Sequence, residues 1–447
     1  MRALLAFTGS RGDAQPGILL ARALIARGHR VTLALAPNLV GFATEHGVPA
    51  VGFGCDSAAL LRAQRTDARF GARNPWARVR AVLDLQRRGV PEMVADLREL
   101  VPGHEVVVAG MAGEEAAAVV AREAGVPFAA MHFFPIQATT VVPVVPARWA
   151  ERIPGVVHRW GWSVLARARA AALAPVLPAG EPPVRVRIQA YDPALFPGLR
   201  DELPGPFTGF PVDVDGVLTT PPTADHRCDD LRIDGPHGSA EGSLPSTETI
   251  RAAGDSPFDT TVAVRRWLAA GSAPIYVGFG SMDVGDPVAL VAMLRAVCAR
   301  RGLRLLLASG WAAIPPSLDA EVAVVDQVDH AEVLPQCVAA VHHGGAGTTA
   351  AALRAGVPQV ICSVQADQPY WGQALQRLGL AATAPARTLT AARLGALLDR
   401  ISTPDVRRRA TDYAATFTTD GVARAADSVE ALAPITSEFV HAAGRLP

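Results

Sequence analysis

The sequence predicts an α/β protein with two doubly wound domains that face each other across a cleft. Short apolar runs typical of buried parallel strands alternate with amphipathic helical stretches along the chain. Polar, glycine-rich loops follow several of these runs, at the edge where open α/β sheets bind their ligands. The 447 residues are enough for two such domains. We expect them at residues 1–210 and 263–447, joined by a linker with a flexible insert at 211–262.

Composition limits the partners and the compartment. Half of the residues are hydrophobic and the formal net charge is zero, so neither a nucleic acid nor an anionic membrane is expected as an obligate partner. The absence of lysine excludes a Walker-type phosphate lysine and Schiff-base chemistry. The five cysteines form no CxxC pair, which indicates thiols in a reducing compartment. The chain shows neither a signal-peptide pattern nor an apolar run near the ~18 residues of a membrane span, so we expect a cytoplasmic protein.

The first domain begins with an apolar strand and a glycine-rich loop. Residues 4–7 form the strand, and the loop GSRGD follows at Gly9 to Asp13. Pro16 is expected to open a helix that Gly28 ends, before the next strand at residues 31–35. The loop is not a GxGxxG fingerprint, so dinucleotide binding is not supported.

The stretch from Val338 to Leu380 predicts a complete strand–helix–strand unit. It opens with an apolar run, continues with HHGGAGTT at residues 342–349, and passes through an alanine-rich helix. A second apolar run at 359–364 leads to a loop that contains Asp367 and Gln368. Polar loops therefore follow both strands of the unit.

These two loops have the chemistry of an anion site beside a carbohydrate site. Glycines at a helix start let backbone N–H groups approach a ligand, and the helix dipole favours an anion. Neighbouring strands lie about 4.8 Å apart, so both loops can reach one ligand, such as a nucleotide-sugar. A tight connection without a ligand is the alternative, but the loop is more polar than a connection needs. The expected donor-binding residues here are His343, Gly345, Ala346, Gly347, Thr348, Asp367 and Gln368.

The motifs HHGGAGTT, LRAGVPQV and DQPYWGQAL, with GSRGD and the GFGSM at Gly278 to Met282, resemble the UDP-glycosyltransferase superfamily. The resemblance is closest to the branch of bacterial antibiotic (glycopeptide and macrolide) and sterol glycosyltransferases. It spans nearly the whole chain. It implies the GT-B fold, a nucleotide-sugar co-substrate and transfer by direct displacement with inversion, with neither a cofactor nor a metal required.

Asp13 is the expected general base. It lies just beyond the first strand, at the ligand edge of the sheet. Sugar transfer to an alcohol requires removal of the acceptor proton, and the resemblance assigns that role to the aspartate of the GSRGD-like motif. The alternative is a helix-capping carboxylate; it is less favoured because Pro16 at the first helical position would make Gln15 the cap.

The acceptor side is expected near the same edge of the first domain. The resemblance implies acceptor-facing residues at Ser10, Arg11, His132, Phe133 and Phe134. For the last three, burial as strand-end core residues is an equal alternative. The segment 148–169 places three tryptophans among arginines; it could be an amphipathic surface for a membrane or lipid, and a packed two-helix segment is the favoured interpretation.

Other residues of the second domain extend the donor site. Ser281 follows a strand where a first loop would touch the diphosphate, although a helix cap is the alternative. Trp311 follows the next strand and could stack on the base or anchor a loop. Gln327 stands where the plant-type motif has a base-stacking tryptophan, which leaves the nucleotide undecided. Asp213 and Asp215 form a DxD pattern without further ligands nearby, so we expect no metal.

These expectations combine into one function with two rivals. We expect a glycosyltransferase that moves a sugar from UDP-glucose or a dTDP-deoxysugar to a hydroxyl of a hydrophobic natural product, with a sterol or other lipid as the alternative acceptor. A nucleotide-sugar epimerase of the same fold is the rival enzyme, and a non-catalytic partner protein is the third possibility. The protein would act as a monomer or homodimer.

Overall fold

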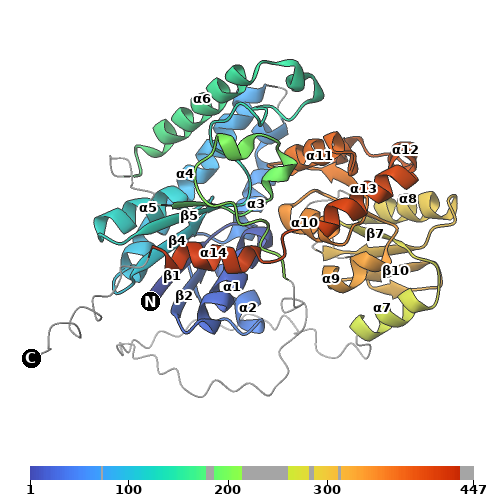
Figure 1. Ribbon diagram of the computed structural model, residues 1–447, viewed down its shortest axis with the longest axis horizontal. Coiled ribbons are helices and arrows are strands. Elements are labelled where there is room, and N and C mark those ends of the chain that lie inside the picture. The colour runs from blue at the N-terminus through green and yellow to red at the C-terminus, as the bar shows by residue number, and fades with distance from the viewer. Residues whose placement is uncertain (72–73, 178–185, 214–259, 281–285, 311–313, 433–447) are drawn as a thin grey trace, which may run out of the picture.

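The computed structural model describes residues 1–71, 74–177, 186–213, 260–280, 286–310 and 314–432, which form two α/β units (Figure 1). The first unit is built on a six-stranded sheet in the order β3-β2-β1-β4-β5-β6, with every pair parallel. Its strands are β1 (Arg2–Phe7), β2 (Arg30–Leu35), β3 (Ala50–Gly52), β4 (Val106–Gly110), β5 (Phe128–His132) and β6 (Val186–Gln189). The strand order reverses between β1 and β4, so the carboxyl end of β1 lies at a ligand-binding position of the fold.

The second unit contains a seven-stranded sheet in the order β13-β12-β11-β7-β8-β10-β9. Only the short edge strand β9 is antiparallel. The strands are β7 (Ile275–Gly278), β8 (Leu305–Ala308), β9 (Ser317–Leu318), β10 (Val322–Val325), β11 (Ala339–His342), β12 (Gln359–Ser363) and β13 (Ala381–Pro385). Here the order reverses between β7 and β11, which places the loop after β11 at the second switch point.

Helices cover the sheets. Those of the first unit are α1 (Arg11–Ala26), α2 (Val40–Glu45), α3 (Ser57–Thr66), α4 (Pro75–Leu100), α5 (Glu114–Glu123) and α6 (Gly155–Leu173). Those that follow are α7 (Thr260–Ala269), α8 (Pro287–Ala299), α9 (His330–Val333), α10 (Ala346–Arg354), α11 (Gln368–Arg377), α12 (Ala391–Ile401), α13 (Pro404–Ala415) and α14 (Gly421–Glu430). In β1, Leu5 and Phe7 belong to one core cluster and Leu4 and Ala6 to another, because alternate side chains point to opposite faces of a strand. Both faces are buried, which explains the continuous apolar runs.

Helix α14 returns to the first unit and packs beside α1 (Figure 1). Its Ala425 and Val429 are fully buried in the same core cluster as β1. Arg27 Nη1 contacts Asp427 Oδ1 at 2.7 Å and Glu430 Oε2 at 2.8 Å. The carboxyl end of the described chain therefore braces the amino-terminal unit. Of the predicted linker and insert at 211–262, residues 214–259 lie outside the described residues. Helix α7 begins at Thr260, slightly before the expected start of the second domain at 263.

Helix α1 begins at Arg11, well before Pro16, which corrects the expected helix start. Ser10 is the N-cap residue, and both its backbone N–H (2.8 Å) and its Oγ–H (2.9 Å) donate to Asp13 Oδ2. Asp13 therefore takes part in the cap, and Gln15 is not the cap. Pro16 lies inside the helix, where it removes the hydrogen bond to the carbonyl four residues earlier. The Ser10–Asp13 contacts outweigh the preference of proline for the first position.

The two units are joined by an aromatic cluster. Trp371 of α11 is fully buried, and its ring centroid lies 5.5 Å from those of Phe196 and Phe210, and 5.6 Å from that of Phe134. All three phenylalanines come from the first 210 residues. Next to this cluster, the Tyr370 hydroxyl donates to the Val144 carbonyl at 2.9 Å. The loop before α11 is thus held against the first unit.

Candidate functional site

The turn after β11 requires glycine at two positions. Gly344 has a φ of +90°, and a Cβ there would lie 2.6 Å from Ile361 Cγ2. At Gly345, the N-cap of α10, a Cβ would lie 2.5 Å from His343 Nε2. Neither position has space for a side chain, and the first also has the left-handed backbone that favours glycine. The turn therefore brings bare backbone to the carboxyl edge of the sheet.

His342 holds this turn in place through a hydrogen bond. It is fully buried at the end of β11, and its Nδ1 accepts the Gly344 N–H at 3.1 Å. Its Nε2 lies 2.9 Å from Gln359 Oε1, so the proton of the neutral ring is on Nε2. Burial lowers the pKa of His342 to about 3, which keeps the ring neutral. Sequence reasoning did not assign this residue; its position at the end of a fully buried strand is the signal that could have identified it.

The amino terminus of α10 carries open backbone donors. The first intrahelical bond runs from the Thr349 N–H to the Gly345 carbonyl at 3.0 Å, so the N–H groups of Ala346, Gly347 and Thr348 precede it. Gly347 is exposed, and nothing lies within 4 Å of a Cβ placed on it. Thr349 is fully buried, which leaves Thr348 as the accessible hydroxyl. Open amides and the helix dipole together form an anion-binding end.

His343 lies between the glycine turn and the loop after β7. A Cβ on Gly280 would lie 3.2 Å from His343 Cε1, and Gly345 is close to His343 Nε2. Burial lowers the pKa of His343 to about 4, so the ring is neutral at pH 7. It can therefore offer an N–H donor to an anion but not a positive charge.

The loop after β12 touches the glycine turn and presents Asp367. A Cβ on Gly344 would lie 3.3 Å from the Gln368 carbonyl oxygen, so the two loops are in direct contact. The Trp371 indole N–H donates to Asp367 Oδ2 at 2.8 Å. Gln368 is 5% exposed, and its Oε1 accepts the N–H groups of Val364 (2.8 Å) and Gln365 (3.0 Å). The Gln368 amide oxygen thus fixes the loop.

Two carboxyl groups from the two units approach each other at this site. Gly9, with a φ of +125°, makes room for Asp13, because a Cβ there would lie 2.4 Å from Asp13 Oδ2. Burial raises the pKa of Asp13 despite the hydrogen bonds from Ser10. The pKa of Asp367 is raised to about 6, mainly by burial and to a lesser extent by the charge of Asp13. Asp13 and Asp367, far apart in the sequence, are therefore within electrostatic range of each other.

Ser10 and Arg11 are engaged within the protein. The Ser10 hydroxyl binds Asp13, as described above. Arg11 Nη1 donates to Gln327 Oε1 of the second unit at 2.9 Å, and its Cζ lies 4.5 Å above the Phe42 ring centroid. Arg11 therefore bridges the two units beside the site.

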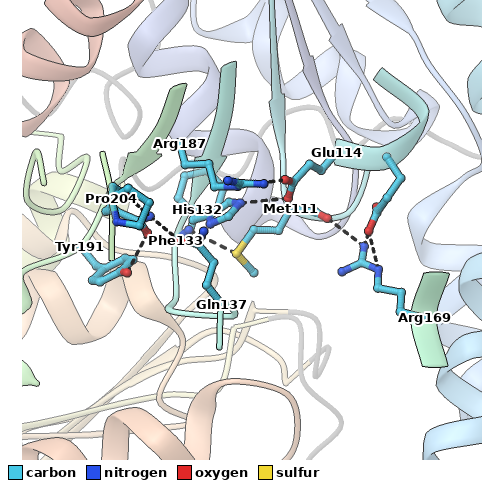
Figure 2. Close-up of polar contacts among 11 residues, drawn as sticks. Met111, Glu114, His132, Phe133, Gln137, Arg169, Arg187, Tyr191 and Pro204 are labelled. Carbon is cyan, nitrogen blue, oxygen red and sulfur yellow. Dashed lines mark hydrogen bonds and ion pairs between the residues drawn. The ribbon is translucent and has the colours of Figure 1, made fainter. Parts of the chain in front are cut away.

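His132, Phe133 and Phe134 are buried at the end of β5. His132 is 1% exposed, and its Nε2 lies 2.9 Å from Glu114 Oε2 (Figure 2). The Phe133 N–H donates to Met111 Sδ at 3.3 Å, and Phe134 packs in the aromatic cluster around Trp371. All three are therefore buried core residues at the end of β5, and Phe134 also contacts the second unit.

Figure 2 shows the polar network that surrounds His132 at the carboxyl ends of β4, β5 and β6. Arg187 approaches Glu114 at 4.0 Å, and Arg169 binds both Glu115 at 2.7 Å and the Met111 carbonyl at 3.2 Å. Side chains in this part of the first unit are thus held to one another by hydrogen bonds and ion pairs.

Two predicted donor residues, Ser281 and Trp311, lie outside the described residues. Among the helices that are described, none is long and apolar enough to cross a membrane. The described side chains also include no group of three or more His, Cys, Asp or Glu placed to hold a metal ion.

Comparison with known families supports this architecture. Residues 3–143 match the family model for the glycosyltransferase family 28 N-terminal domain. Residues 308–425 match the model for the C-terminal domain of erythromycin biosynthesis protein CIII-like proteins. The first match contains Asp13, and the second contains the glycine turn and Asp367.

Relatives and solved structures extend the match to nearly the whole chain. The glycosyltransferase Rv1524 of Mycobacterium tuberculosis (strain ATCC 25618 / H37Rv) is 34% identical over 436 residues, which covers 94% of this chain and 95% of that protein. Vancomycin aglycone glucosyltransferase of Amycolatopsis orientalis is 28% identical, with 95% and 96% covered.

Among solved structures, the glycosyltransferase VinC in complex with dTDP aligns with a TM-score of 0.60 at 20% identity, covering 97% of this chain and 99% of VinC. The glycosyltransferase of kitacinnamycin aligns with a TM-score of 0.61 at 22% identity, with the same coverage. These likenesses confirm the predicted GT-B fold. The chain belongs to the glycosyltransferases, in the branch that includes the glycopeptide and macrolide antibiotic enzymes.

Proposed function

We propose that this enzyme transfers a sugar from a nucleoside diphosphate donor, UDP-glucose or a dTDP-deoxysugar, to a hydroxyl of a hydrophobic small molecule with inversion. The observation that supports this best is the open amino terminus of α10, in contact with the loop of Asp367, a residue whose pKa responds to the charge of Asp13 in the other unit. A diphosphate, a sugar and an acceptor hydroxyl need three such groups side by side. VinC, a protein of the same fold, is solved in complex with dTDP, which supports a nucleoside diphosphate as part of the donor.

In the proposed donor complex, backbone amides hold the diphosphate. The N–H groups of Ala346, Gly347 and Thr348 and the ring N–H of His343 donate to phosphate oxygens. Because these donors are fixed before the reaction, they stabilise the negative charge that grows on the leaving diphosphate. This electrostatic role requires no metal ion. Ser281 and Trp311 belong to the same proposed site, the first at the diphosphate and the second at the base.

Asp367 and Gln368 hold the sugar in this proposal. Asp367 accepts hydrogen bonds from sugar hydroxyls when it is ionised, and Trp371 fixes the direction of its carboxylate. Gln368, whose Oε1 binds the Val364 and Gln365 N–H groups, serves the sugar site mainly by holding the loop that presents Asp367. Since the pKa of Asp367 is about 6, the carboxylate is available above that pH.

Asp13 acts as the general base in the proposed reaction. Its Oδ2 is held by Ser10, which leaves Oδ1 to take the acceptor proton. The acceptor oxygen then bonds to the anomeric carbon as the bond from that carbon to the diphosphate oxygen breaks. A raised pKa brings a carboxylate closer to the operating pH and improves it as a base. One displacement inverts the anomeric centre.

The acceptor site belongs beside Asp13 in the first unit. Ser10, Arg11, His132, Phe133 and Phe134 remain the proposed acceptor-side residues, with burial limiting the last three to shaping the site rather than lining it. A natural-product alcohol or phenol is the proposed acceptor class, and a sterol or other lipid is the alternative. The enzyme is proposed to act in the cytoplasm as a monomer or homodimer.

A product assay tests the whole proposal. The purified enzyme is incubated with UDP-glucose and several dTDP-sugars, with and without a set of aromatic and macrolide aglycones, and the products are identified by mass spectrometry. We expect one donor to bind and to yield a glycosylated acceptor of inverted configuration. Absence of donor binding and of slow donor hydrolysis across the set would contradict the proposal, and conversion of a free donor into its epimer would establish the rival enzyme.

A further inference from the structure

The segment between Val145 and Trp160 exposes large apolar side chains on the first unit. Trp149 is 59% exposed, Trp160 65% and Val156 68%, while Val145 and Val157 are each 43% exposed. No other stretch of comparable length in the described chain exposes so many. Of the tryptophans in this region, only Trp162 is packed, so the packed interpretation of the segment is wrong for the other two. Exposed apolar clusters of this kind mark interaction sites.

Helix α6 holds this surface in a fixed orientation. On its inner face, His158 Nε2 contacts the Ala150 carbonyl at 3.0 Å and the Trp162 N–H donates to the Val142 carbonyl at 2.8 Å. Gly161 lets the helix approach the preceding segment, because a Cβ there would lie 2.9 Å from Val144 Cγ1. Val156 and Trp160, spaced four residues apart, therefore share the opposite, outward face. The apolar surface is a rigid feature rather than a loose loop.

An ion pair links α6 to the segment that precedes it. Glu202 accepts hydrogen bonds from Thr139 and Thr140 and pairs with Arg159 of α6 at 3.3 Å. Burial alone would raise the pKa of Glu202, but the hydrogen bonds from Thr140 and Thr139 lower it to about 2, so the carboxylate stays charged. Glu202 therefore connects the first turns of α6 to the segment 139–144, whose Val144 carbonyl accepts a hydrogen bond from Tyr370.

Basic side chains lie in the same segment as these apolar ones. Residues 145–173 contain five arginines and a single acidic residue, Glu151. Arg159 is paired with Glu202 and Arg169 with Glu115, so these two charges are compensated within the protein. Arg152 and Arg167 are exposed. Tryptophan prefers the headgroup region of a bilayer, and arginine stems extend along apolar surface while their charges reach the headgroups. An apolar face with surrounding positive charge is the pattern of a helix that lies on an anionic membrane.

We propose that Trp149, Val156, Val157 and Trp160, here called the α6 surface, dock on the headgroup region of an anionic lipid bilayer. The association is reversible and local, so it agrees with the neutral charge of the whole chain. It depends on neither the donor nor the acceptor assigned above, and it would bring the enzyme to apolar acceptors that dissolve in lipid.

Vesicle co-sedimentation of the full chain tests the proposal. We expect binding to vesicles of phosphatidylcholine mixed with phosphatidylglycerol, weaker binding to pure phosphatidylcholine, and release by added salt. The double variant Trp149→Gln/Trp160→Gln should lower the partition coefficient at least ~10-fold. A tenfold change corresponds to a loss of only about 1.4 kcal/mol of binding free energy. The matched control is Val288→Gln/Leu318→Gln, which changes two other exposed apolar residues (79% and 52% exposed) and should bind like the unchanged protein.

Thermal unfolding of both double variants checks that the fold is intact, which is expected because all four side chains are exposed. The proposal is overturned if the unchanged protein does not bind mixed vesicles, if it binds pure phosphatidylcholine equally well, or if the tryptophan variant binds as tightly as the control. Capture of a soluble partner protein through Trp149 and Trp160 without lipid binding would also overturn it.

Discussion

The ligand-binding edges of the two sheets are formed by different kinds of chemical groups. In the second unit, the groups that face the site are mainly backbone amides, exposed by glycines that have no room for a side chain. In the first unit, the corresponding edge is made of side chains held by other side chains, such as Asp13 by Ser10 and His132 by Glu114. A backbone site depends on the turn itself, whereas a side-chain site depends on each partner. We therefore expect the two edges to respond differently to substitution.

The largest effect is expected from Asp13→Asn. The amide keeps the size of the side chain but cannot take the acceptor proton, so transfer should fall about 10²–10⁴-fold. Donor affinity, measured by calorimetry with the donor found in the product assay, should change little, because the proposed diphosphate-binding amides of α10 lie in the other unit.

Asp56→Asn is the matched control for this change. Asp56 caps α3 through the Ala59 N–H at 2.7 Å, and asparagine caps as well as aspartate. Its turnover should stay the same. Unchanged turnover in Asp13→Asn would remove Asp13 from the role of base and leave it as a capping residue.

The next largest effect is expected from Gly345→Ala. The new Cβ would lie 2.5 Å from His343 Nε2, so either the ring or the turn must move. Because the open amides follow directly, we expect donor and nucleoside diphosphate affinity to fall about 10²-fold, roughly the loss of two charge-assisted hydrogen bonds. Gly41→Ala is the control, since no atom lies within 4 Å of the added carbon in α2. Equal diphosphate affinity in both variants would place the anion elsewhere.

Much of the fold and one half of the site could be predicted from sequence, for a physical reason. Gly344 and Gly345 are dictated by local geometry, so the motif itself reveals the turn after β11. The start of α1 could not be predicted, because the Ser10–Asp13 contacts override the usual position of Pro16. The burial of Phe134 and the contact from Arg11 to Gln327 depend on the other unit, which no local pattern encodes.

Trp371→Phe tests whether the residue that joins the two units also orients Asp367. Phenylalanine keeps an aromatic ring in the cluster but removes the N–H that binds Asp367 Oδ2. A hydrogen bond to a charged group contributes about 1.5–3 kcal/mol, so we expect the donor KM to rise at least ~10-fold with the acceptor KM unchanged. Trp267→Phe is the control, because the Trp267 N–H binds the Asp319 carbonyl at 2.6 Å and not a residue of the candidate site. Its donor KM should not change.

The pH profile separates this effect from a general loss of packing. Asp367 is ionised above its pKa of about 6, so donor affinity should fall as pH drops through 6. The Trp371 N–H lowers that pKa, and its removal should move the fall to higher pH. An unshifted profile together with a lower melting temperature would show that Trp371 contributes packing alone.

The smallest expected effect concerns strain in the same loop. Ala366, just before Asp367, has a φ of +54° and is the single non-glycine residue with positive φ among the described residues. A left-handed residue with a Cβ costs roughly 1–2 kcal/mol, which Ala366→Gly would relieve at the expense of a more flexible unfolded chain. We expect a net gain of about 0.5–1 kcal/mol by urea unfolding and a slightly weaker donor affinity, because the loop that presents Asp367 loses rigidity. Ala43→Gly, in α2, should destabilise by a similar amount. If Ala366→Gly also destabilises, contacts of the Ala366 methyl group outweigh the strain, and the loop is held by packing rather than by backbone geometry.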